Sequence, residues 1–86
     1  MTEPELIRMF HTKVGKVAAG AIDAMKQKSM KLDTNLREVI ELIQTHGPAP
    51  TIAAIASLLY KGIAPSGPAV AFEIEALQPK KSAFRR

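Results

Sequence analysis

Residues 35–78 have the sequence NLREVIELIQTHGPAPTIAAIASLLYKGIAPSGPAVAFEIEALQ. Three short segments with apolar residues at mostly helical spacing are separated there by HGPAP (residues 46–50) and KGIAPSGP (residues 61–68). Glycine and proline interrupt helices, because glycine readily leaves helical backbone angles and proline lacks an N–H donor. The stretch therefore predicts three helices joined by two turns, the order of elements in a helix-turn-helix.

Capping residues set the expected ends of the first two helices. The first begins at a cap within residues 33–35 and stops at Gly47, whereas the second begins after Pro50, is capped by Thr51 and stops at Gly62. Their apolar residues are expected to pack into one scaffold. Its central members are Ile40, Ile43, Ile55 and Leu59.

The third segment has two interpretations. Ser66 or Gly67 can cap a helix with Pro68 in its first turn, and the content of Ala, Glu and Leu favours this helix. The alternation of apolar residues from Val70 to Ala76 is instead typical of a strand, which would have to pair across a dimer. Helix is the preferred interpretation, and strand remains the alternative.

The N-terminal part predicts one long helix that ends near Lys28. Thr2 and Glu5 have the spacing of a capping box, and Pro4 falls in the first turn. One apolar stripe then continues through Leu6, Phe10, Val14, Val17, Ala21 and Met25. Gly15 and Gly20 lie inside this helix and each weaken it by about 1 kcal/mol relative to Ala, which predicts that another backbone comes close to them.

This stripe is too long for a small three-helix core to cover. Its uncovered part would be an apolar patch, and such patches mark contact surfaces. A symmetric homodimer is therefore expected. Its contact residues would be Leu6, Phe10, Val14 and Val17.

The sequence predicts an all-α protein. Residues 1–78 would form one helical domain, and residues 79–86 would form a basic, mobile tail. The 86 residues are enough for one core, and with 47% hydrophobic but 5% aromatic residues this core must be aliphatic. The absence of Cys excludes disulfides, thiolate zinc sites and cysteine nucleophiles. His11 and His46 have no second ligand at helical spacing, and no phosphate-binding glycine motif is present. We expect no enzyme activity, metal or cofactor.

No apolar run approaches the ~20 residues that a membrane helix needs, and no secretory signal opens the chain. A cytoplasmic protein without a membrane partner is expected. The net charge of +4 is uneven: residues 32–78 are net acidic, whereas the tail carries Lys80, Lys81, Arg85 and Arg86 and no acid.

Residues 36–81 resemble the helix-turn-helix DNA-binding domains of LexA-like repressors and KfrA-like plasmid proteins. The features that match are the helix end at Gly47, the Pro50-Thr51 step, Ile55-Ala56 followed by Leu59, and the cap at Ser66 with Ala69, Ile74, Ala76 and Leu77 after it. The resemblance implies a recognition helix that begins near Ser66. That helix departs from the pattern because it has no Arg, Lys, Asn or Gln before Gln78.

Two functions follow as hypotheses. The first is a DNA-binding transcriptional regulator or a plasmid or phage accessory factor. Its nucleic-acid-binding residues would be Lys61, Ser66, Gly67, Ala69, Lys80, Lys81, Arg85 and Arg86. The second is a small protein-interaction module, an inhibitor or adaptor that engages another protein through the alanine-rich helices and the SGPAVAFEIEAL segment (residues 66–77).

Overall fold

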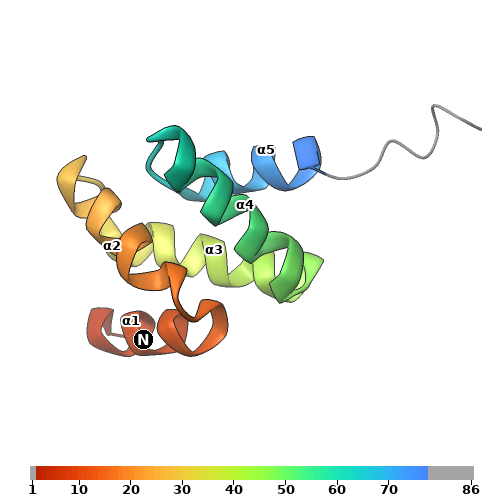
Figure 1. Ribbon diagram of the computed structural model, residues 1–86. Coiled ribbons are helices and arrows are strands. Elements are labelled where there is room, and N and C mark those ends of the chain that lie inside the picture. The colour runs from red at the N-terminus through yellow and green to blue at the C-terminus, as the bar shows by residue number, and fades with distance from the viewer. Residues whose placement is uncertain (1, 78–86) are drawn as a thin grey trace, which may run out of the picture.

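A computed structural model describes residues 2–77, which form five α-helices and no strand. The all-α prediction is therefore confirmed for this part of the chain. The helices are α1 (Glu3–Val14), α2 (Val17–Gln27), α3 (Leu32–His46), α4 (Pro48–Lys61) and α5 (Gly67–Leu77). Helix α3 is central, since it contacts the other four, and Figure 1 shows α1 and α5 on opposite sides of it.

The prediction of one long N-terminal helix is wrong, because a turn at residues 15–16 separates α1 from α2. Gly15 lies at the break with φ of +71° and ψ of −131°, a conformation that glycine adopts readily and other residues do not. No atom outside its chain neighbours lies within 4 Å of the place where a Cβ would be. Gly15 therefore allows the chain to turn, and no other backbone lies close to it. The start of α1 is as predicted, with a Thr2–Glu5 capping box.

The break lets the apolar stripe fold onto the chain's own core. Leu6, Phe10 and Val14 are each at most 4% exposed, and Val17 is partly buried against the same core. The reason for placing a dimer contact on these four residues was an uncovered stripe. That premise is wrong, since one chain covers three of them.

Helix α3 begins earlier than its predicted caps and has no capping side chain. It starts at Leu32, whose side chain is buried, and it ends at Gly47 as predicted. Asn35 does not cap α3. Its Nδ2 donates to the carbonyl oxygen of Lys31 at 2.8 Å, and its Oδ1 faces α5 instead.

Helix α4 starts at Pro48 and not after Pro50, so only Gly47 separates it from α3. Prolines fit the first turn of a helix because the N–H groups there have no partner within the helix. Thr51 is therefore not a cap: it is fully buried inside α4, and its hydroxyl donates to the Gly47 carbonyl at 3.0 Å. The end at Gly62, with φ of +79°, is as predicted.

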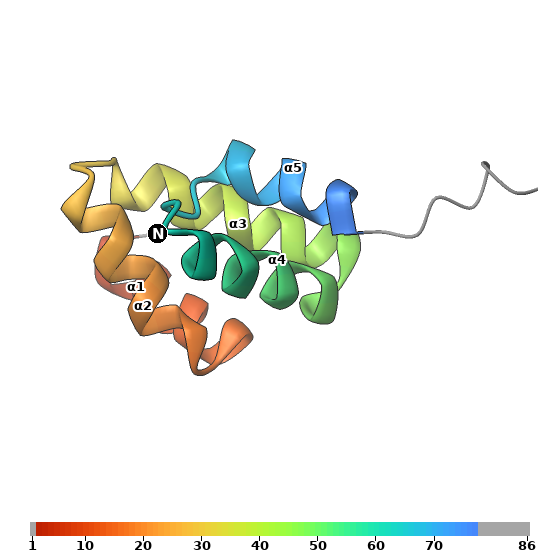
Figure 2. The ribbon, with the colours of Figure 1, turned by 45° about the horizontal axis from the view of Figure 1, so that its top comes forward.

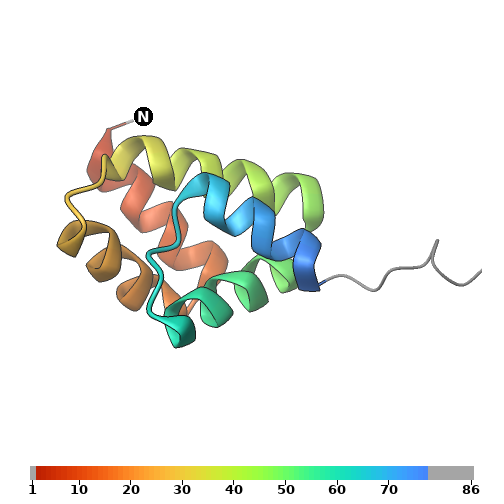
Figure 3. The same ribbon diagram turned by 90° about the horizontal axis from the view of Figure 1, so that it is seen from above.

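Helix α5 packs against both α3 and α4, and these three helices form one side of the molecule (Figures 2 and 3). Val70 and Ile74 are buried one turn apart, whereas Phe72 between them is 73% exposed. A strand would have placed all three on one face, so the helical interpretation is confirmed and the strand alternative is wrong.

The core is aliphatic, as the composition predicts, apart from Phe10. Of the four expected scaffold residues, Ile40, Ile43 and Ile55 are buried and Leu59 is partly buried against the same cluster. Among the described residues, no helix combines the length and hydropathy needed to cross a bilayer. The cytoplasmic location stays a prediction.

Candidate functional site

The first turn of α5 is the place where the helix-turn-helix hypothesis puts its DNA contacts. Helix N-termini bind phosphate through free N–H groups. Here the Gly67 N–H donates to Asn35 Oδ1 at 3.1 Å, and Pro68 has no N–H. The next two N–H groups of α5 both donate to Ser66. The Ala69 N–H donates to the Ser66 Oγ at 3.3 Å, and the Val70 N–H donates to the Ser66 carbonyl oxygen at 2.9 Å. This turn has no free donor for a phosphate.

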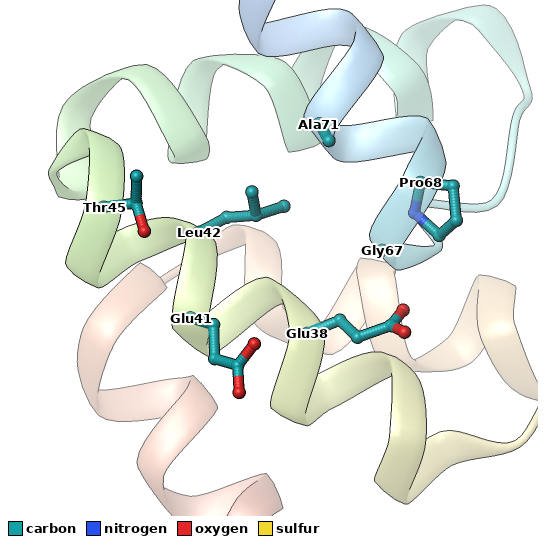
Figure 4. Close-up of a pocket in the computed structure, with 7 residues that line it drawn as sticks. All are labelled: Glu38, Glu41, Leu42, Thr45, Gly67, Pro68 and Ala71. Atoms are coloured by element: carbon teal, nitrogen blue, oxygen red, sulfur yellow. The ribbon is translucent and has the colours of Figure 1, made fainter.

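A carboxylate lies beside the same turn. A Cβ on Gly67 would fall 2.7 Å from Glu38 Cβ and closer still to Glu38 Oε1, so α5 rests directly on this side chain (Figure 4). The negative charge of Glu38 favours the positive end of the α5 dipole but repels a DNA phosphate. Gly67 itself is buried and Ala69 is partly buried, so neither presents a surface that could read bases.

Lys61 is engaged in an interhelical cluster that also includes Ser57 and Glu73. Its Nζ donates to Glu73 Oε2 at 2.8 Å, and the Ser57 Oγ donates to the same oxygen at 2.6 Å. Glu73 is buried, and the hydrogen bond from Lys61, followed by that from Ser57, lowers its pKa below the usual value. The cluster joins α4 to α5 and neutralises the one Lys that the DNA hypothesis places in the helical part. Lys80, Lys81, Arg85 and Arg86 lie outside the described residues.

The solvent side of α5 is apolar and acidic. We define the α5 face as the exposed residues of this helix. They are Pro68, Phe72, Glu75, Ala76 and Leu77. Phe72 is 73% exposed and Leu77 is 51% exposed, in a protein whose only other described phenylalanine, Phe10, is fully buried. Glu75 is the only charged residue of the α5 face.

A groove of about 300 Å³ runs beside the α5 face, between α3 and α5. We call it the α3–α5 groove. Figure 4 shows its lining, in which Leu42, Pro68 and Ala71 supply apolar surface and Glu38 and Glu41 supply carboxylates. Pro68 belongs to both the α3–α5 groove and the α5 face, so the two form one continuous surface.

Other exposed apolar side chains are more isolated. Tyr60 is 93% exposed at the end of α4, where it follows the exposed alanines Ala49, Ala53 and Ala56 at helical spacing. Ile63 is 46% exposed in the loop before α5. Ile63 lines a pocket between α2 and α4 whose only charged lining residue is Lys28, so that pocket has no carboxylate.

The sequence contained a signal for the α5 face, and it pointed to the protein-interaction hypothesis. Pro68, Phe72 and Ala76 recur at intervals of four, so a helix must place them on one side. The partner groove on α3 had no such signal, because Glu38, Glu41 and Leu42 are separated from α5 by more than twenty residues. Within residues 2–77, no three His, Asp or Glu side chains cluster as metal ligands would.

Comparison of the chain with protein-family models, with curated proteins and with solved structures finds no match. The resemblance of residues 36–81 to LexA-like and KfrA-like domains therefore stays a prediction.

Proposed function

We propose that this protein is a small interaction module that binds another protein through the α5 face. The observation that carries the proposal is the exposure of Phe72, 73% of whose surface is open to solvent on a helix that is otherwise well packed. Aromatic side chains of this kind dominate the energetics of protein interfaces, because they bury a large apolar area with few rotatable bonds.

The anchoring of α5 supports the same function. An interaction surface works best when its backbone is held in place before binding, because less conformational entropy is then lost. Asn35 holds the first turn of α5, the Lys61–Glu73 ion pair holds its middle, and Val70 and Ile74 are inserted in the core. Phe72 therefore projects from a fixed helix.

A photo-cross-linking experiment in the native host tests this proposal. A photoreactive phenylalanine analogue is placed at Phe72, and in a matched control at Thr12, which is exposed on α1 away from α5. We expect a discrete protein adduct from position 72 that is absent from position 12. The proposal fails if position 72 gives no adduct beyond those of position 12.

DNA binding remains the second candidate, and the observation that favours it is the uneven charge. Residues 1–31 carry six Lys and Arg, of which all but the partly buried Lys13 are exposed, and the tail carries four more. Four tail contacts with phosphate would contribute about 3 to 4 units to the slope of log affinity against log salt. Replacing the four basic tail residues by Gln should remove that share of the slope for mixed-sequence duplex DNA. An unchanged slope would exclude the tail from DNA contact.

A further inference from the structure

We infer that the partner presents a basic segment, in which an apolar side chain lies between lysines or arginines, and that the α3–α5 groove receives it. This inference rests on the proposed function, since it names the chemical class of the partner for the surface that includes the α5 face. It adds a second contact area to that surface, on α3.

The charged residues that line the groove are all acidic. Glu38 and Glu41 line it, and Glu75 is exposed one helical turn beyond Ala71, which also lines it. No Lys or Arg is among the lining residues, and none of these three carboxylates forms a salt bridge with a described residue. Such a rim attracts Lys and Arg side chains and repels acidic or phosphorylated ligands.

The floor of the groove is apolar and of limited size. Leu42 and Ala71 are partly buried and Pro68 is exposed, so a bound side chain would cover surface that solvent now reaches. A volume of about 300 Å³ is at the lower end for ligand sites and holds one or two side chains. Phe72 lies one turn from Pro68 and extends the apolar surface beyond the groove.

These features select a partner segment over a small molecule. The groove is open to solvent, Pro68 joins it to the α5 face, and Glu38 and Glu41 are exposed. A peptide can place one apolar side chain on the floor while its flanking cations reach Glu38 and Glu41. The same chemistry occurs in this chain at residues 80–86, KKSAFRR, so the experiment must separate a partner from the chain's own tail.

The test measures binding of a fluorescent peptide, GKKALFRRG, to the full chain by anisotropy. We compare Glu38→Gln/Glu41→Gln with the control Glu3→Gln/Asp23→Asn, which removes the same charge from α1 and α2. We expect the groove variant to bind about two- to thirtyfold more weakly, the range that two exposed ion pairs produce, and the control to stay close to wild type. Circular dichroism confirms that both variants are folded.

Several results would overturn the inference. They are an absence of saturable binding up to millimolar peptide, and equal weakening in the groove and control variants. Tighter peptide binding after Lys80, Lys81, Arg85 and Arg86 are replaced by Gln would assign the groove to the chain's own tail. Self-association that Glu38→Gln/Glu41→Gln abolishes would assign it to a second copy.

Failure of this inference and failure of the proposed function are distinguishable. If the Phe72 adduct forms equally in the Glu38→Gln/Glu41→Gln background, the protein binds a partner through the α5 face but not through a basic segment in the groove. If no adduct forms at Phe72, the proposed function itself fails.

Discussion

Gly15 is the residue that separates the observed fold from the one predicted from the sequence. Its apolar neighbours follow a single helical stripe, and a continuous helix would leave that stripe uncovered. The positive φ at Gly15 turns the chain so that α2 packs against α1 and α4. One backbone angle thus decides whether Leu6, Phe10 and Val14 lie in the core or on the surface.

A pair of identical substitutions five residues apart tests this role. Gly15→Ala should destabilise the protein by about 1 to 3 kcal/mol, because an L-residue is strained at this φ and ψ. Gly20→Ala should stabilise it by up to about 1 kcal/mol, because Gly20 is within α2 and the new methyl group would meet only the flexible end of Leu59, 3.3 Å away. Urea unfolding measures both, and the same sign for the two variants would contradict the account.

Residue patterns predicted the ends of helices better than their beginnings. Gly47 and Gly62 stop helices where expected, because a glycine with positive φ ends a helix irrespective of its surroundings. The beginnings of α3 and α4 were placed too late. Leu32 and Pro48 extend these helices backwards, since burial of Leu32 and the tolerance of the first turn for proline outweigh the absence of a side-chain cap.

Helices α4 and α5 share the most extensive pairing among the five described helices. The Ser57–Lys61–Glu73 cluster is its polar part. Glu73 is buried, although a carboxylate in an apolar segment normally lies on the solvent side. Two hydrogen-bond donors on α4 make the buried carboxylate tolerable, and no pattern within α5 alone could reveal them.

The lowered pKa of Glu73 has a consequence for stability at acidic pH. A carboxylate whose pKa is lower in the folded than in the unfolded protein stabilises the fold above its usual value of 4.5 and loses this contribution as the pH falls through the lowered value. Glu73→Gln should therefore be less stable than wild type at neutral pH. Its stability should also fall less steeply as the pH is lowered from neutral to below the usual pKa of 4.5.

Urea midpoints across this pH range measure the effect of Glu73→Gln. Glu5 also has a lowered pKa, caused by its hydrogen bonds with Thr2, but it contributes equally to wild type and variant. Glu75→Gln is the matched control, since it removes an exposed carboxylate two residues away on the same helix. If the urea midpoint of Glu73→Gln falls with pH as steeply as that of wild type, the ion pair with Lys61 does not stabilise the fold.

The apolar stripe of the N-terminal part is covered within one chain, so the reason to expect a homodimer no longer holds. The homodimer prediction depended on an exposed surface at Leu6, Phe10 and Val14, and these side chains are buried within one chain. Among the described residues, the largest exposed apolar side chains, Tyr60 and Phe72, lie on different helices. Within residues 2–77, the stripe that was the reason to expect a dimer is therefore not available as a contact surface.

We therefore expect sedimentation equilibrium at micromolar concentration to give the mass of one chain. Phe72→Ser, which removes the most exposed apolar side chain of the α5 face, should leave that mass and the unfolding free energy nearly unchanged. A dimer in wild type that Phe72→Ser converts to monomer would show that a second copy of this chain occupies the α5 face.

The order of helices in space also bears on how the native protein opens. Helix α5 comes last in the described chain and contacts only α3 and α4, whereas α3 contacts every other helix. Opening of α5 disrupts its pairings with α3 and α4 alone, whereas opening of α3 disrupts a pairing with every other described helix. In native-state hydrogen exchange, the amides of α5 would then exchange sooner than those of α3. A bound partner would slow them most, so exchange protection in α5 would report occupancy of this surface without a label on either protein.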